Sequence, residues 1–142
     1  KFQVLIANGY NLDEFNLESI KVDGYAIEVR IYAEDSQRLA PSIGTITKAY
    51  FPNFTNVRVD THVINGYTIT QFYDNMIAKL IVKGKDRTEA IKKLNIYLDQ
   101  VIIEGVKTNI EFLKKIVNDK DYIEYKYNTR TVDNMLKELS KV

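Results

Sequence analysis

The sequence predicts an α+β fold in which an antiparallel β-sheet is followed by packed helices. Segments that alternate apolar and polar residues, as β-strands do, occupy the chain from about residue 25 to residue 84. Segments with apolar residues at helical spacing follow, from residue 87 onward. Because the strands come first and the helices afterwards, the order favours an antiparallel sheet over a parallel one.

The chain begins with a short helical pattern, KFQVLIANG, in which Phe2, Leu5 and Ile6 share one face and Gly9 marks the end. A helix of about two turns has little stability by itself. We therefore expect this segment to be the end of a helix in a longer protein. The predicted division is residues 1–23, the end of an entering helix and a polar connector, and residues 24–142, one domain.

Strand patterns follow the connector. Residues 25–34, YAIEVRIYAE, alternate so that the odd positions face a core and Glu28, Arg30 and Glu34 share the opposite face. After a loop, TITKAYF at 45–51 and NVRVDTHVI at 56–64 read as strands.

A hairpin and a longer strand complete the predicted sheet. Asn65-Gly66, between β-rich runs, is the dipeptide that a type I′ hairpin turn requires. FYDNMIAKLIVKG, residues 72–84, is expected to be a long strand with one face buried by Met76, Ala78, Leu80 and Val82.

Three helices are predicted in the second half of the chain. Asp86 with Glu89, and Thr108 with Glu111, have the spacing of a capping box ahead of apolar runs. A third helical stripe lies near the end, formed by Val132, Met135, Leu136 and Leu139.

Composition narrows the possible functions. The 142 residues suffice for one domain with a real core. The chain has 20 Lys and Arg and 19 Asp and Glu, so its net charge is +1. Such a balance does not indicate binding to nucleic acid or to an anionic membrane. No apolar run is long enough to span a bilayer. The absence of cysteine excludes disulfides and thiolate chemistry. No Gly-rich phosphate loop follows a strand, so no nucleotide cradle is predicted.

Two isolated polar residues are predicted to be structural. His62 is the only histidine, and without cysteines or a second histidine it is a poor metal ligand. We expect it to be a buried, hydrogen-bonded histidine. Lys79 lies among apolar neighbours and must reach solvent or a carboxylate. No metal site is predicted.

Arg30 is the candidate with a chemical rationale. Its guanidinium stays protonated, and its fork of donors suits a planar oxyanion such as a carboxylate or bicarbonate. Glu28 and Glu34 could hold it in one rotamer. A polar strand face is usually solvated, so the residue pattern alone keeps the structural interpretation ahead of the functional one.

Five segments, taken in order, carry a resemblance to a known family. The resemblance covers the chain from about Gly24 to about Leu136. They are GYAIEVRIYAED, PSIGTIT, NVRVDTHVINGYTI, FYDNMIAKLIVKGKDRTEAI and IIEGVKTNIEFL. Together they resemble the C-terminal domain of the biotin carboxylase component of biotin-dependent carboxylases. KFQVLIANG resembles the tail of the helix that enters this domain from an ATP-grasp portion.

The resemblance implies a ligase that uses ATP and Mg²⁺ or Mn²⁺ to activate bicarbonate as carboxyphosphate. The carboxyl group then passes to the N1′ nitrogen of biotin on a carrier protein or domain. In such enzymes the ATP-grasp domain supplies most nucleotide and metal contacts, and the C-terminal domain closes the site with one arginine. That arginine corresponds to Arg30, whose fixed charge would stabilise the negative ureido oxygen. The resemblance thus implies a cytoplasmic enzyme of which this fragment is inactive alone.

The resemblance also implies partners. Arg58 and Asp74 correspond to homodimer interface positions, and Thr129 lies near the position that touches adenine. The sequence departs from the family pattern at three places. PNFTN stands in place of a glycine-rich turn, Thr70-Gln71 in place of a proline pair, and Ile43 in place of a proline or threonine. The first departure weakens the expectation of a dimer.

The sequence does not predict which acceptor substrate the complete enzyme carboxylates, because a separate carboxyltransferase selects that substrate. Relatives include acetyl-CoA carboxylases of fatty acid biosynthesis, acyl-CoA carboxylases and pyruvate carboxylases. The competing hypothesis is a non-enzymatic scaffold or protein-interaction module built on the same sheet, in which Arg30 has no catalytic role.

Overall fold

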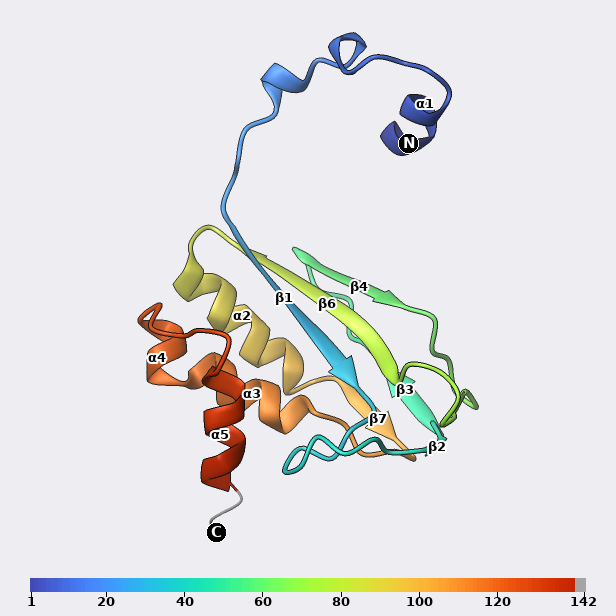
Figure 1. The fold of residues 1–142 in the computed structure, drawn as a ribbon, viewed down its shortest axis with the longest axis vertical. Coiled ribbons are helices and arrows are strands. Elements are labelled where there is room, and N and C mark those ends of the chain that lie inside the picture. The colour runs from blue at the N-terminus through green and yellow to red at the C-terminus, as the bar shows by residue number, and fades with distance from the viewer. Residues whose placement is uncertain (140–142) are drawn as a thin grey trace.

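A computed structural model describes residues 1–139 and has the predicted α+β class, with antiparallel sheets and helices packed against them (Figure 1). In chain order the elements are α1 (Phe2–Ala7), the 3₁₀ turns Leu12–Glu14 and Leu17–Ser19, β1 (Tyr25–Tyr32), β2 (Gly44–Thr45), β3 (Lys48–Tyr50), β4 (Val57–Thr61), β5 (Thr68–Ile69), β6 (Met76–Gly84), α2 (Arg87–Leu98), β7 (Ile102–Glu104), α3 (Ile110–Asn118), α4 (Lys120–Ile123) and α5 (Thr131–Leu139).

The main sheet has the strand order β1-β6-β4, with the long strand β6 in the centre. β6 pairs antiparallel with β1, from Tyr25 opposite Gly84 to Arg30 opposite Lys79. On its other side it pairs antiparallel with β4, where Asp60 lies opposite the same Lys79. Two short antiparallel pairs, β2 with β5 and β3 with β7, extend the β structure.

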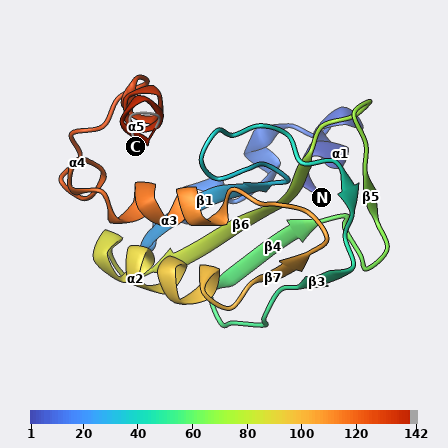
Figure 2. The same ribbon diagram turned by 90° about the horizontal axis from the view of Figure 1, so that it is seen from below.

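The core lies between the apolar face of the main sheet and α2, with α3 beside α2 (Figure 2). The alternation predicted for β1 is observed, and Ala78, Leu80 and Val82 of β6 are buried on the same face. The prediction is wrong at the start of β6, where Met76 is only half-buried and Ile77 is buried at a shift in register. Tyr97 of α2 is fully buried, and its hydroxyl donates to the carbonyl of Pro52 at 2.8 Å. Burial raises the pKa of Tyr97 to about 12.

The predicted Asn65-Gly66 hairpin is wrong. β5 pairs with β2, not with β4, and β4 pairs with β6. Of the two turn residues only Gly66 has a positive φ, +88°, whereas a type I′ turn needs it at both. The dipeptide correctly marked a turn, but strand partners are set by the tertiary fold.

Helix starts were predicted with mixed success. Asp86 caps α2 by accepting from the Glu89 amide at 2.8 Å, as expected. The carboxylate of Glu89 reaches back to the Lys85 amide instead of to Asp86. For α3 the capping prediction at Thr108 is wrong: the N-cap position is Asn109, whose side chain bonds to β1. Neither β7 nor α4 was predicted.

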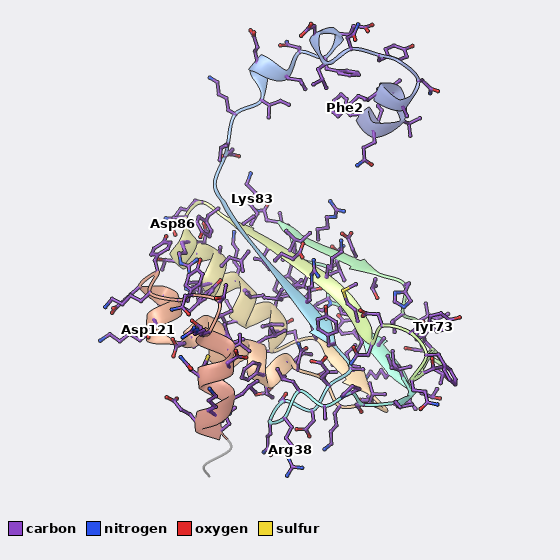
Figure 3. The ribbon with its side chains drawn as sticks, viewed as in Figure 1. Phe2, Arg38, Tyr73, Lys83, Asp86 and Asp121 are labelled. Carbon is purple, nitrogen blue, oxygen red and sulfur yellow. The ribbon has the colours of Figure 1, made fainter. Side chains whose placement is uncertain are left out.

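The N-terminal arm stands away from the sheet and helices (Figures 1 and 3). α1 ends at Ala7, close to the expected stop, and Gly9 has φ +91°. None of the α1 residues is buried, and Phe2 is 52% exposed. The division at residue 23 stays a prediction. Within residues 1–139, no helix has both the length and the apolar character needed to cross a membrane.

Candidate functional site

Arg30 projects from the polar face of β1, as the alternation predicted. Its side chain is 58% exposed, and its Nε donates to Oε1 of Glu28 at 3.2 Å. Hydrogen bonds to the side chains of Tyr32 and Glu28 raise the pKa of the guanidinium above its ordinary value. The group is therefore a permanent cation held near the strand and open to an anionic ligand.

Glu34 does not hold Arg30, so that part of the prediction is wrong. The register of β1 shifts between Ile31 and Tyr32, and the strand ends at Tyr32. Glu34 instead accepts a hydrogen bond from the Asn75 amide at 3.4 Å. The period-two pattern that placed Glu34 beside Arg30 does not continue beyond the end of β1 at Tyr32.

Asn109 fixes the backbone that directly follows the Arg30 side chain. Its amide Oδ1 accepts from the Tyr32 N–H at 2.9 Å, and its Nδ2 donates to the Arg30 carbonyl at 3.1 Å. Asn109 is only 6% exposed. The prediction from sequence missed this residue, although a polar side chain just before an apolar helix was the available signal.

A cavity of about 380 Å³ lies beside Arg30 between β1, α3 and the C-terminal segment. Its walls are mainly apolar, and they include Arg30, Tyr32, Phe112, Leu113, Tyr122 and Val132. A cation at the rim of an apolar-walled hollow can orient a ligand that has both an apolar body and a negatively charged oxygen. This arrangement is the structure's candidate ligand site.

The polar face continues across the sheet as a row of charges. Lys79 lies opposite Arg30 and reaches Oδ2 of Asp60 at 3.8 Å. Arg58 makes two bonds to the same carboxylate, each 2.9 Å long. The Arg58 hydrogen bond lowers the pKa of Asp60. Lys79 thus has a carboxylate partner, which fits its predicted structural role.

The other predicted residues lie outside the cavity lining. Asp74 accepts from the Met76 amide at 2.7 Å at the start of β6. Thr129 is exposed in the turn before α5. His62 is exposed, which corrects the expectation of a buried histidine; its ring packs edge-on against Tyr67 with centroids 5.0 Å apart. His62 lies two residues after Asp60, so the alternation of β4 also places it on the polar side of the sheet.

The resemblance implies a metal ion and organic cofactors, and the described residues suit only the organic kind. Among residues 1–139, no three His, Asp or Glu side chains come together in a way that could hold a metal ion. The described residues therefore do not fit a metal site. Arg30 and its cavity do fit an organic ligand with an anionic oxygen.

Fold and site together define an α+β domain that presents one arginine from a sheet edge to an open cavity. The family model described as "Biotin carboxylase C-terminal domain" matches residues 28–134, which is more than half of the chain. The chain belongs to this family.

Individual relatives support the same family assignment. Biotin carboxylase 2 of Bacillus subtilis is 47% identical over 86% of this chain and 27% of its own length. The 2-oxoglutarate carboxylase small subunit of Hydrogenobacter thermophilus is 42% identical over 94% of this chain and 28% of its own length. The chain therefore spans less than a third of the length of these relatives.

Solved structures share the fold. The biotin carboxylase of Campylobacter jejuni matches with a TM-score of 0.88 and 39% identity, over 94% of this chain and 29% of that one. The biotin carboxylase domain dimer of the Hydrogenobacter thermophilus 2-oxoglutarate carboxylase, in complex with MgADP, ADP and bicarbonate, matches with a TM-score of 0.88 and 40% identity, over 97% of this chain and 30% of that one.

Proposed function

We propose that this chain is the C-terminal domain of a biotin carboxylase that couples ATP cleavage to the carboxylation of carrier-bound biotin with bicarbonate. The observation that supports the proposal most is Arg30, a fixed cation at the rim of an apolar-walled cavity in a chain of this family. The domain closes the active site of the longer enzyme and has no turnover by itself. ATP supplies the activation of bicarbonate, and its metal, Mg²⁺ or Mn²⁺, is held by residues outside this domain.

Arg30 has the catalytic role in this proposal. Its guanidinium lies against the biotin ureido oxygen and stabilises the negative charge that develops there. Glu28 restricts the side chain through the 3.2 Å bond to Nε, and Asn109 fixes the backbone beneath it. Because an arginine does not lose its proton, this charge is constant across the working pH range.

The proposal also covers the dimer interface, the nucleotide contact, the partners and the localisation. Arg58 and Asp74 contribute to a homodimer interface in the full enzyme; Arg58 is 72% exposed and so accessible to a second subunit. Thr129, exposed ahead of α5, contacts the adenine of ATP. The partners are a biotin carboxyl carrier protein or domain and a carboxyltransferase, and the enzyme is cytoplasmic.

The test uses a longer carboxylase chain that contains this domain. Arg30→Ala is expected to lower biotin-dependent ATP cleavage on the order of 10²-fold or more, because one transition-state charge contact is lost. The control is Arg38→Ala, which removes an exposed arginine from the loop after β1 (Figure 3) and should leave the rate unchanged. Normal turnover in the Arg30 variant would reject the catalytic role and favour a scaffold.

A further inference from the structure

Arg87, the first residue of α2, is a buried cation whose hydrogen bonds go to uncharged groups. It is 8% exposed. One terminal nitrogen donates to the Tyr25 hydroxyl at 2.9 Å, and the other donates to the main-chain carbonyl of Tyr122. Within residues 1–139, its Nε has no hydrogen-bond partner. Because burying a charge is costly unless other groups compensate it, the surroundings of this side chain must supply the compensation.

Four tyrosine rings supply it. The guanidinium carbon lies 4.4 Å from the ring centroids of both Tyr122 and Tyr125. The rings of Tyr25 and Tyr127 are 5.6 and 5.9 Å away. Cation–π attraction strengthens when the cation is removed from water. Burial lowers the pKa of Arg87, but the Tyr25 hydrogen bond and the neighbouring tyrosine hydroxyls outweigh it and raise the pKa overall.

The four rings come from distant parts of the chain. Tyr25 begins β1, whereas the other three belong to the segment that follows α3. Figure 3 labels Asp86 and Asp121, the neighbours of Arg87 and Tyr122, on the same side of the domain. The arginine therefore ties the segment around α4 to the first turn of α2 and the start of the sheet.

Tyr125 lies in the turn that follows α4. Its φ of +59° lies in the left-handed region, which is unfavourable for a residue with a side chain. The conformation turns the chain at the end of α4 and places the ring over the guanidinium. A backbone hydrogen bond from the Lys126 N–H to the Asp121 carbonyl at 2.7 Å closes this turn, as is common at helix ends.

The attached segment borders the candidate site. Tyr122 and Val132 form part of the cavity wall beside Arg30. Thr129 lies between the tyrosine cluster and α5, and no residue of α5 as far as Leu139 is buried. The buried contacts of Arg87 are thus well placed to control where this part of the chain lies.

We propose that Arg87 is a positioning residue, which holds segment 120–139 in place and thereby sets the cavity wall beside Arg30 and the site of Thr129. Its effect on nucleotide binding rests on the proposed function, whereas its effect on the segment does not. Loss of the arginine should free the segment while the sheet stays folded.

Hydrogen exchange on the 142-residue chain tests the first part. Arg87→Met should speed amide exchange in residues 122–139 by about tenfold or more, with β6 still protected. Arg87→Lys should fall between Met and the parent chain, because it keeps the charge but loses the planar fork. Lys92→Met, at an exposed position of the same helix, is the matched control. Unchanged exchange in the segment would overturn the proposal.

A second variant covers the case in which Arg87→Met does not fold. Tyr125→Ala removes a ring that is 62% exposed, so the core is left intact. It should speed exchange in the same segment without affecting β6. Exchange that rises equally in β6 and in the segment would indicate a general loss of stability and would reject the positioning role.

Kinetics of a longer carboxylase chain test the second part. Arg87→Lys should raise the KM for ATP by about tenfold and leave kcat within about twofold, which is the pattern of lost binding without lost chemistry. An unchanged KM despite faster exchange would overturn the link to the ligand. If instead Arg30→Ala keeps full turnover, the proposed function fails, whatever the result for Arg87.

Discussion

The amide of Asn109 is expected to be one of the most important polar side chains in the domain. In Asn109→Ala, the Tyr32 N–H and the Arg30 carbonyl lose their side-chain partners in a half-buried position. Leaving a buried donor or acceptor without its partner costs about 1–3 kcal/mol, and in this half-buried position we expect about 1–2 kcal/mol for each of the two groups. The free energy of unfolding should therefore fall by about 2–4 kcal/mol.

Asn109→Asp keeps one of the two hydrogen bonds and removes the other. The carboxylate still accepts from Tyr32, but it cannot donate to the Arg30 carbonyl and places two acceptors against each other. Its cost should be comparable with that of the alanine variant. Asn118→Ala is the matched control, because Asn118 lies on the same helix α3 but is exposed, and its partners can bond to water.

Urea unfolding monitored by circular dichroism and tyrosine fluorescence supplies the measurement, since the chain has 10 tyrosines and no tryptophan. The expected order of stability is parent, then Asn118→Ala, then the two Asn109 variants. Faster exchange of the Tyr32 amide should accompany the loss. A change below about 0.5 kcal/mol in Asn109→Ala, with the slope of the transition unaltered, would refute the reasoning.

Three further predictions concern stability. Asp86→Ala should cost about 1 kcal/mol in urea unfolding, because the Glu89 amide loses its cap; an unchanged midpoint would contradict this. Asn56 has φ +65°, so Asn56→Ala should destabilise by about 1 kcal/mol and Asn56→Gly should not; equal stabilities would argue against strain there. The Lys107 hydrogen bond, then the amides after Asp35, lower the pKa of Asp35 to about 2. This stabilisation is present above about pH 4 and lost as pH falls toward 2, so Asp35→Asn should flatten the thermal stability profile in that window.

Much of the fold could be predicted because its signals are local. The alternation in β1 and β6 reports burial on one face, and the Asp86 cap acts within four residues. The pairing of β5 with β2 could not be predicted in this way, since strand partners are chosen by the whole chain. Glu34 was misplaced because the residue pattern continues to residue 34, whereas the strand ends at Tyr32.

In the candidate site, too, some residues could be predicted from the sequence and others could not. Arg30 could be singled out because its residue type, strand face and family resemblance agree. Asn109 and Tyr122 reach the site only because α3 packs beside β1 and α4 packs against α3, over separations that residue spacing does not encode. The exposure of His62, by contrast, follows from the alternation of β4, which puts it on the same side as Arg58 and Asp60.

The shared carboxylate of Asp60 has a consequence for experiments on subunit association. Arg58 and Lys79 compete for it, and Lys79 in turn lies directly across from Arg30 on the neighbouring strand. Removing Arg58 would let Asp60 turn fully toward Lys79, and the balance of charge around the arginine two strands away would change. Under the proposed function, an Arg58 variant made to separate subunits would therefore also change the electrostatic surroundings of Arg30 in molecules that stay paired.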